Sequence, residues 1–425
     1  MSVKAPRGTQ DILPKNSAAW AWVEDEARSL FTRFGFAEIR TPIFESTELF
    51  TRGVGEATDI VQKEMYTFAD RKGRSLTLRP EGTASVARSF MEHHLAQTAN
   101  PVKVFYMGPM FRYERPQAGR YRQHQQIGAE VLGASGPTAD FEMIAMLVQF
   151  FENLGFRGLK VLLNSVGDRE CRPDYSEALR DYVKGREADL SEDMRRQLNM
   201  NPLRMLDSKD PKAKALVEGM PSIQDFLNED CKEHQRRLLD LLDEAGIAYE
   251  LDAKLVRGLD YYTKTVFEVQ HGGLGAQSAI GGGGRYDNLV EEVGGASTPA
   301  VGFSTGVERI LMALEADKVA LPEQAKPEVS IVVAGAEAER KTGAMLALRL
   351  RKQFRVDIDV LDRGLGSQMK AANKKQAQLA LILGEEELKT RTWTLKDLDS
   401  GTQFSVEDKD LESFISKQLS SGETP

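Results

Sequence analysis

Short β-type segments follow one another through the first third of the chain with little helical sequence between them. They lie near residues 65–68, 76–79, 102–111 and 126–132, and Pro and Gly residues separate them. Strands without long crossover connections pair most simply as antiparallel neighbours, because a parallel pair needs such a crossover. The pattern therefore predicts a largely antiparallel sheet and argues against the βαβ alternation of a dinucleotide-binding domain.

Helical sequence lies on either side of this β-rich region. Residues 17–34 carry apolar side chains at the spacing of an amphipathic helix, which Gly35 ends. Residues 170–248 are highly charged and mostly helical in pattern, and β-type sequence returns after them. We therefore expect a first domain of residues 1–325 that contains a helical insertion at about residues 170–248.

The pattern changes again after the polar, proline-bounded segment 321–327. From residue 328 onward, helical segments alternate with strands of the buried type, for example at 330–335 and 379–384. This alternation is typical of α/β domains. We expect a separate α/β domain over residues 328–425.

Composition narrows the class of protein. The chain has 425 residues, 56 basic and 64 acidic, and 41% of its residues are hydrophobic, as in ordinary globular proteins. It has no apolar run near the ~20 residues that span a bilayer and no secretory leader pattern at its start. With only Cys171 and Cys231, a disulfide scaffold is excluded. We expect a cytoplasmic protein that binds neither membranes nor DNA, with local basic patches left as the way to hold RNA.

Common nucleotide and metal signatures are missing from the sequence. It contains no GxxxxGK[ST] loop, no GxGxxG after a strand and no HExxH, and its five histidines lack the spacing of metal ligands. Any ATP chemistry therefore needs another device, and we expect no metal site built by the protein.

Two segments carry arginines in positions suited to phosphate binding. Residues 111–126 hold four arginines around a Pro/Gly turn between two strands, and residues 300–311 form a glycine-spaced strand that leads into a helix with Arg309. A guanidinium group presents a planar fork of donors that matches phosphate oxygens. Taken singly, the first segment could be a solvated hairpin and the second ordinary strand–helix packing.

Together with residues 35–44, these segments resemble the three motifs of class II aminoacyl-tRNA synthetases, in the same order along the chain. The matching residues here are Gly35–Phe44, Phe111–Glu114 and Gly302–Arg309. Within that class, two further segments resemble the histidine-specific signatures of the histidyl-tRNA synthetase family, namely Val256–Thr263 and Gly282–Asp287. Residues 7–11 and 79–83 also look like that family, so the resemblance spans nearly the whole chain.

The resemblance implies an α+β fold, in which helices flank a class II antiparallel sheet with a helical insertion and an α/β anticodon-binding domain follows. It implies a histidine–tRNA ligase of protein biosynthesis that makes histidyl-adenylate from histidine and ATP and then transfers histidine to the 3′ end of tRNA(His). It also implies a homodimer, with the helix before Gly35 and the strand kinked at Pro42 at the subunit interface. Mg²⁺ would be carried with ATP rather than held in a protein cage.

Family members place arginines around the ATP phosphates. By resemblance, Arg112 contacts the α-phosphate, Arg309 the γ-phosphate and Arg120 the outer phosphates. Arg257 lies on the other side of the α-phosphate as the catalytic cation. The resemblance also assigns the adenine amino group of ATP to Glu114. It assigns the acceptor end of tRNA to Arg115 and Gln117.

Histidine itself needs partners for an ammonium, a carboxylate and an imidazole. The resemblance assigns the ammonium to Glu81 and Thr83, and places Gln126 between the ammonium and the carboxylate. It assigns the ring nitrogens to Glu130 and Tyr262, and the full histidine-binding set also includes Tyr261, Arg112 and Arg257. The tyrosines could instead be packing residues, whereas a carboxylate within the apolar strand 128–132 is costly without a partner.

Two alternative functions remain to be weighed, together with a departure of this sequence from the family pattern. The departure is His124, which stands where the family commonly has an aromatic ring on the strand that stacks on adenine. The first alternative is the synthetase-like regulatory subunit of ATP phosphoribosyltransferase in histidine biosynthesis, which lacks the C-terminal domain and several catalytic residues. Here Arg112, Arg257, Arg309 and the α/β domain are present, which favours the enzyme. A proline or threonine synthetase leaves the RGLDYYT segment unexplained.

Overall fold

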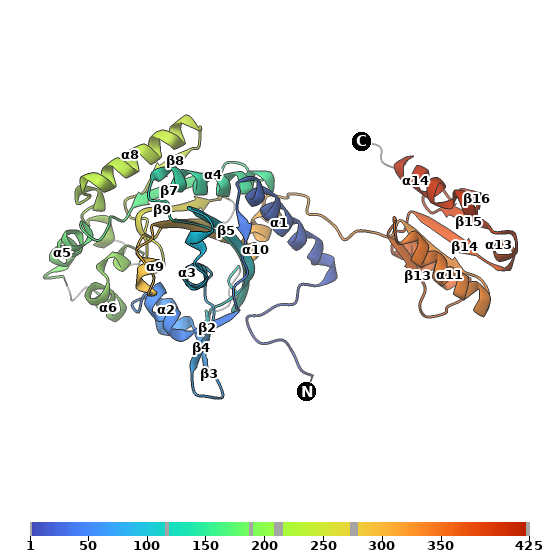
Figure 1. Ribbon diagram of the computed structural model, residues 1–425, viewed down its shortest axis with the longest axis horizontal. Coiled ribbons are helices and arrows are strands. Elements are labelled where there is room, and N and C mark those ends of the chain that lie inside the picture. The colour runs from blue at the N-terminus through green and yellow to red at the C-terminus, as the bar shows by residue number, and fades with distance from the viewer. Residues whose placement is uncertain (1, 115–118, 187–189, 208–215, 273–278, 422–425) are drawn as a thin grey trace. The chain divides into compact units, whose positions relative to one another are not determined.

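An eight-stranded sheet forms the centre of the first of two structural units (Figure 1). Its strand order is β1-β5-β6-β11-β10-β9-β7-β8. The bounds are Ala37–Glu38 (β1), Val102–Phe111 (β5), Gln123–Leu132 (β6), Ala300–Gly306 (β11), Ala279–Arg285 (β10), Thr263–Gln270 (β9), Lys160–Ser165 (β7) and Tyr249–Leu251 (β8). Only the terminal pairs β1–β5 and β7–β8 are parallel, so the prediction of a largely antiparallel sheet is confirmed.

The computed structural model divides the chain into two compact units, Met1–Glu323 and Gln324–Pro425. The described residues are 2–114, 119–186, 190–207, 216–272 and 279–421.

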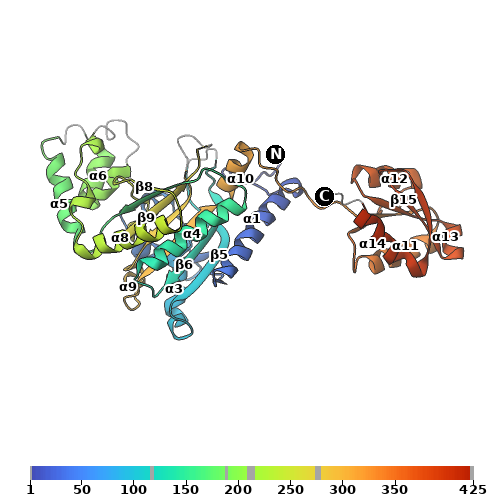
Figure 2. The ribbon, with the colours of Figure 1, turned by 90° about the horizontal axis from the view of Figure 1, so that it is seen from above.

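Helices cover one face of the large sheet and build the main hydrophobic core there (Figure 2). Inward-facing residues of β6, such as Ile127 and Ala129, pack against these helices. Because side chains alternate along a strand, Gln126, Gly128 and Glu130 of β6 face the opposite side. The helices on the first face are α1 (Pro14–Arg33), α4 (Pro137–Asn153), α8 (Glu229–Glu244) and α10 (Val307–Ala316).

The opposite face of the sheet is covered in part by α3 (Thr83–Glu92) and the short α9 (Leu289–Glu292). A smaller three-stranded sheet of the same unit is ordered β2-β4-β3. Its strands are Phe44–Ser46 (β2), Ser75–Leu78 (β4) and Tyr66–Ala69 (β3), and α2 (Thr47–Val54) follows β2. The uncovered part of the large sheet's second face is where the candidate site lies.

Between β7 and β8 the described residues form a helical region that includes α5 (Arg172–Val183), α6 (Glu192–Met200), the 3₁₀ turns Pro202–Asp207 and Ile223–Asp225, and α8. Apolar side chains of α5 pack with Leu203, Ile223 and Cys231 in a small core of their own. This helical region, residues 168–248, is called the insertion below. The insertion meets the rest of the first unit in two ways. Leu238 and Leu242 of α8 belong to the main core, and polar side chains such as Arg204 bond to the segment before β9.

The second unit contains a five-stranded sheet ordered β13-β12-β14-β15-β16. The first three of these strands are parallel and the last two are antiparallel additions. The strands are Val356–Ile358 (β13), Val329–Val333 (β12), Leu379–Leu383 (β14), Thr392–Asp397 (β15) and Gln403–Glu407 (β16). Its helices are α11 (Glu337–Leu350), α12 (Leu365–Lys374), α13 (Glu385–Thr390) and α14 (Leu411–Ser421). In the described parts of both units, every helix is too short or too polar to cross a bilayer.

Candidate active site

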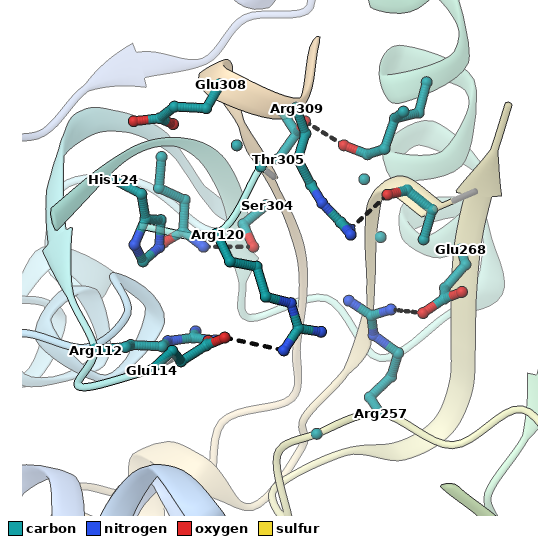
Figure 3. A pocket seen from close by; sticks show the side chains of 18 of the residues that line it. Arg112, Glu114, Arg120, His124, Arg257, Glu268, Ser304, Thr305, Glu308 and Arg309 are labelled. Atoms are coloured by element: carbon teal, nitrogen blue, oxygen red, sulfur yellow. Dashed lines mark hydrogen bonds and ion pairs between the residues drawn. The ribbon is translucent and has the colours of Figure 1, made fainter. Parts of the chain in front are cut away.

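A cavity of about 270 Å³ opens on the second face of the large sheet. Four arginines from three distant segments of the sequence line it (Figure 3). Arg112 follows the end of β5, Arg120 lies in the turn before β6, Arg257 precedes β9, and Arg309 lies in the first turn of α10. The structure thus brings together all four residues that the resemblance assigned to the phosphates.

Each arginine is held by an oxygen at the rim or wall of the cavity. Arg120 Nη1 donates to Glu114 Oε2 at 2.9 Å, and Arg309 Nη1 donates to the Ala279 carbonyl at 2.7 Å. Arg112 Nε donates to the Pro80 carbonyl at 2.8 Å. These contacts hold the guanidinium groups at the wall of the cavity, where an anion would meet several of them at once.

Arg257 forms an ion pair with Glu268 on the neighbouring strand β9 (Figure 3). Burial alone would lower the pKa of Arg257, but the Glu268 carboxylate raises it above its ordinary value. The Nε atom of Arg257 has no hydrogen-bond partner among the described residues. Burial, and then the charge of Arg120, lower the pKa of Arg309. Several cations so close together repel one another, and a polyanion would relieve that repulsion.

One end of the cavity is lined by less basic groups. His124 lies on β6, and burial, followed by the charge of Arg112, lowers its pKa to about 3. The ring is therefore neutral at neutral pH. Glu308 accepts a hydrogen bond from the Gln125 N–H at 3.0 Å, and burial raises its pKa to about 7. The neutral ring of His124 offers a flat surface, and the carboxyl group of Glu308 offers hydrogen-bond acceptors beside it.

A cluster of buried polar residues lies next to the cavity, behind the residues that line it. Glu130 is 1% exposed and accepts hydrogen bonds from Thr83 Oγ1 at 2.7 Å and Tyr286 Oη at 2.6 Å. Burial nevertheless raises the pKa of Glu130 to about 8. Desolvation outweighs two good donors here, so the carboxyl group is largely protonated at neutral pH.

Glu81 belongs to the same buried cluster. Its carboxylate accepts from the backbone N–H groups of Thr83 at 2.7 Å and Ala84 at 2.8 Å, at the start of α3. Burial raises its pKa, and these N–H donors oppose that rise. The N-terminus of a helix is a favourable place for a carboxylate. The chain thereby keeps a potential anion in the interior beside Glu130.

Three aromatic residues connect the cluster to the cavity. The rings of Tyr261 and Tyr262 are 4.7 Å apart between centroids, and Tyr261 contacts Tyr286 at 5.5 Å. Tyr262 also lines the cavity, whereas Tyr261 is buried behind it. Glycines make room for this arrangement: a Cβ atom on Gly302 would lie 1.6 Å from Glu130 Oε2, so no larger residue fits beside the carboxyl group.

The predicted histidine-binding residues therefore divide into two groups. Arg112, Gln126, Arg257 and Tyr262 line the cavity. Glu81, Thr83, Glu130 and Tyr261 form the buried cluster. Gln126 Nε2 donates to Ser304 Oγ at 2.9 Å, and its Oε1 atom has no partner among the described residues. Of the remaining predictions, Glu114 lines the cavity, while Arg115 and Gln117 lie outside the described residues.

Sequence reasoning assigned no role to three side chains that the structure places in or beside the site: Glu268, Ser304 and Tyr286. Glu268 had a usable signal, because it is a charged residue within the apolar run Val266–Val269, as Glu130 is within its own strand. Tyr286 lies two residues after the glycine run Gly281–Gly284, but its partner Glu130 is 156 residues away. No spacing rule connects such residues.

Potential metal ligands gather in the described residues away from this cavity, at the base of the insertion. They are Asp168, Cys171 and Cys231. Asn228 Nδ2 donates to Asp168 at 3.0 Å, and Cys231 Sγ donates to the same carboxylate at 3.3 Å. Burial, followed by that carboxylate, raises the pKa of Cys231. The hydrogen bonds satisfy the carboxylate, so the cluster fits a structural junction better than a cation site.

Comparisons with known proteins show the family of the chain. The family described as "Histidyl-tRNA synthetase" matches residues 8–310, and the family described as "Anticodon binding domain" matches residues 328–418. A protein named "Histidine--tRNA ligase" from Natranaerobius thermophilus is 48% identical over 416 residues, covering 98% of this chain and 99% of that protein. One with the same name from Thermosynechococcus vestitus is 49% identical, covering 97% of this chain and 96% of that protein.

Among solved structures, the apo histidyl-tRNA synthetase of S. aureus is similar with a TM-score of 0.83 and 37% identity, covering 97% of this chain and 100% of that chain. The Nostoc enzyme of the same name, at 23% identity and a TM-score of 0.69, shares the fold, covering 99% of this chain and 100% of that chain. From matches that extend over both units, we conclude that this chain belongs to the histidyl-tRNA synthetase family.

Proposed function

We propose that this protein activates histidine with ATP to give histidyl-adenylate and then transfers the histidyl group to the 3′ end of tRNA(His). Its relatives are histidine–tRNA ligases over almost their full length, so it is an aminoacyl-tRNA synthetase. The observation that carries the proposed mechanism is the convergence of Arg112, Arg120, Arg257 and Arg309 on one cavity. A triphosphate is the kind of ligand that such a set of cations suits.

In the first step, a carboxylate oxygen of histidine attacks the α-phosphorus of ATP. The bond from that phosphorus to the oxygen bridging to the β-phosphate breaks, and pyrophosphate leaves. A carboxylate is already ionised at neutral pH, so the step needs no general base. What the protein must supply is positioning and positive charge around the phosphorus. We assign that task to Arg112 and Arg257, and the outer phosphates to Arg120 and Arg309.

The buried cluster provides groups for recognising histidine. We assign the ammonium to Glu81 and Thr83, and Gln126 to a position between the ammonium and the carboxylate. The imidazole is assigned to Glu130 and Tyr262, with Tyr261 behind them. Support comes from the burial of Glu130 and from the free Oε1 acceptor of Gln126. A pocket with such buried polar groups rejects side chains that leave them unpaired, by ~10⁴-fold or more.

The other cavity groups suit the nucleoside of ATP. We assign the adenine amino group to Glu114, and the neutral ring of His124 to the adenine face. Mg²⁺ prefers oxygen ligands, and the carboxylates lining the cavity are already engaged, as in the pairs Glu114–Arg120 and Glu268–Arg257. We therefore propose that Mg²⁺ enters bound to ATP, where it offsets phosphate charge.

In the second step, a 3′-terminal hydroxyl of tRNA attacks the carbonyl carbon of histidyl-adenylate, and AMP leaves. We propose that Arg115 and Gln117 meet the acceptor end. We also propose residues 1–325 as the catalytic domain, with an insertion at about 170–248, and residues 328–425 as the domain that binds the anticodon. The match of residues 328–418 to anticodon-binding domains supports the last assignment.

We propose a homodimer that works in the cytoplasm. Exposed apolar side chains on the small sheet support the dimer, since Phe44 and Phe68 are 51% and 45% exposed and contact one another at 6.4 Å between ring centroids. Exposed aromatic pairs of this kind are typical of interfaces. Cys171 and Cys231 are free thiols, which suits a reducing compartment.

The regulatory-subunit alternative is less well supported. A Bacillus halodurans chain titled as an ATP phosphoribosyltransferase regulatory subunit/histidyl-tRNA synthetase shares the fold at 22% identity and a TM-score of 0.63, covering 90% of this chain and 98% of that chain. The present chain has the second unit and all four cavity arginines. Both features are what the ligase reaction needs.

Pyrophosphate exchange tests the proposed function directly. Labelled pyrophosphate should enter ATP when histidine is present, and not with any of the other nineteen amino acids. Labelled histidine should then appear on tRNA(His). Exchange driven by another amino acid would overturn the substrate assignment, and no exchange with any amino acid would favour the regulatory alternative.

A further inference from the structure

The segment that carries Arg257 is an irregular connection. It runs from the end of β8 at Leu251 to the start of β9 at Thr263, and its residues form no strand or helix. Sheet hydrogen bonds therefore do not hold Arg257 in place. Arg257 reaches the cavity from this segment, so the place of its guanidinium group depends on its ion pair with Glu268 and on the contacts that hold the segment itself.

Side chains of the insertion supply those contacts just after Arg257. Arg204 Nε donates to Asp260 Oδ1 at 2.9 Å, and Arg204 Nη2 donates to the Gly258 carbonyl at 2.8 Å. Asn201 Nδ2 donates to the same Asp260 oxygen at 2.7 Å. The side chains of Arg204 and Asp260 are only 12% and 20% exposed, so this is a partly buried ion pair rather than a surface contact.

A third insertion side chain contacts the far end of the segment. Arg172 at the start of α5 donates from Nη1 to the Tyr262 carbonyl at 2.9 Å. Burial, opposed by the charge of Asp260, lowers the pKa of Arg172. On its other side, Asp260 abuts the end of α2, where a Cβ atom on Gly55 would lie 2.7 Å from Asp260 Oδ2. Asp260 is thus confined between α2 and the insertion.

We propose that Arg204 and Asn201 of the insertion are positioning residues for Arg257 in adenylate formation. This inference rests on the proposed function. The insertion holds Gly258 and Asp260 by hydrogen bonds, and these residues stand one and three positions after Arg257. By fixing this stretch of backbone, it places the guanidinium group beside the α-phosphate. Catalytic groups must be placed to within a fraction of an ångström, and a misplacement of about 1 Å can cost on the order of a hundredfold in rate.

The alternative reading is that these contacts only attach the insertion to the sheet. Kinetics separate the two readings. A lost attachment lowers stability but leaves the rate of the folded fraction alone. A lost positioning contact lowers kcat for adenylate formation through Arg257 and has little effect once Arg257 is gone.

The test compares Arg204→Met with the matched control Arg236→Met in histidine-dependent pyrophosphate exchange. Arg236 also lies in the insertion, but its ion pairs are with Glu233 and Asp240 of its own helix. We expect Arg204→Met to lower kcat by about ten- to a hundredfold, with KM for ATP changed less than about threefold. The control should match the unmodified protein.

A double-mutant comparison shows whether Arg204 affects the rate through Arg257. In an Arg257→Ala background, adding Arg204→Met should lower the rate by less than about twofold. An equal loss in both backgrounds, or an unchanged kcat in Arg204→Met, would overturn the inference. If Arg204→Met does not fold, Asn201→Ala removes one hydrogen bond and should still lower kcat severalfold only when Arg257 is present. Absence of exchange in the unmodified protein would instead reject the proposed function.

Discussion

The buried cluster and the open cavity of the candidate site hold their charged groups in different ways. In the cluster, Glu130 has two hydroxyl donors and Glu81 has two backbone donors, so protein partners already orient both carboxyl groups. In the cavity, Arg120 pairs with Glu114 and Arg257 pairs with Glu268, and these guanidinium groups line one open space together with other arginines (Figure 3).

This difference assigns the two parts to different tasks. A preformed, desolvated set of polar groups selects a ligand by shape and hydrogen bonding, because a mismatch leaves buried groups unpaired. Converging cations in a wetter cavity gain most from a highly charged ligand or transition state. Mutations in the cluster should therefore change amino-acid binding, and mutations of the cavity arginines should change the rate of the chemical step.

The largest effect is expected for Arg257→Ala. Removing a cation that meets charge developing at the α-phosphorus should lower the rate of adenylate formation by about 10²- to 10³-fold. The thermal unfolding temperature should change little, because Arg257 extends into the cavity. Single-turnover measurement of histidyl-adenylate, with Arg236→Ala as the surface control, checks this. Near-normal turnover would remove Arg257 from the mechanism.

A smaller and differently directed effect is expected for Glu130→Gln. The amide keeps the size of the side chain but cannot become an anion, so it holds an imidazole less well. We expect the Kd for histidine to rise by about tenfold to a hundredfold, while the Kd for ATP stays within about twofold. Calorimetric titration with each substrate measures both. An equal loss of ATP binding would break the division between cluster and cavity.

The smallest effect concerns stability as a function of pH. Burial raises the pKa of Glu130 to about 8, from a model-peptide value of 4.5. Between these values the folded chain holds a proton that the unfolded chain has released. The stabilising contribution is therefore complete below about pH 4.5 and is lost as the pH rises toward 8, by at most about 1.4 kcal/mol per pH unit.

Urea unfolding of the unmodified protein and of Glu130→Gln at pH 5, 6, 7 and 8 measures this term. The difference in unfolding free energy between the two proteins should shrink steadily over that range. Glu308, whose pKa burial raises to about 7, titrates in both proteins, so it cancels from the difference. A constant difference would show that Glu130 is ionised throughout.

Local sequence signals were sufficient where structure depends on neighbours along the chain. The strand predicted at residues 102–111 is β5, and the helix predicted at 17–34 is α1, which begins at Pro14. The strand predicted at 126–132 begins earlier, at Gln123, because it pairs with β5 along its whole length. Alternation along β6 also placed Gln126 and Glu130 on one face.

Contacts between distant segments were beyond such signals. The partnership of Tyr286 with Glu130 arises because β6 and β10 both flank β11 in the sheet, although they are far apart in sequence. The ion pair of Arg204 with Asp260 likewise depends on where the insertion packs against the segment before β9. Family resemblance could name Arg112, Arg257 and Arg309 without explaining why they meet.

By itself, the sequence determined the types of its segments, the faces of its strands and the supply of arginines and carboxyl groups, since these follow from periodicity and side-chain chemistry. Tertiary structure alone decided which of those groups became neighbours. The physical reason is that burial and proximity set their properties: Glu130 keeps its proton because the sheet and its helices exclude water around it, and Arg257 pairs with Glu268 because two segments meet across an edge of the cavity.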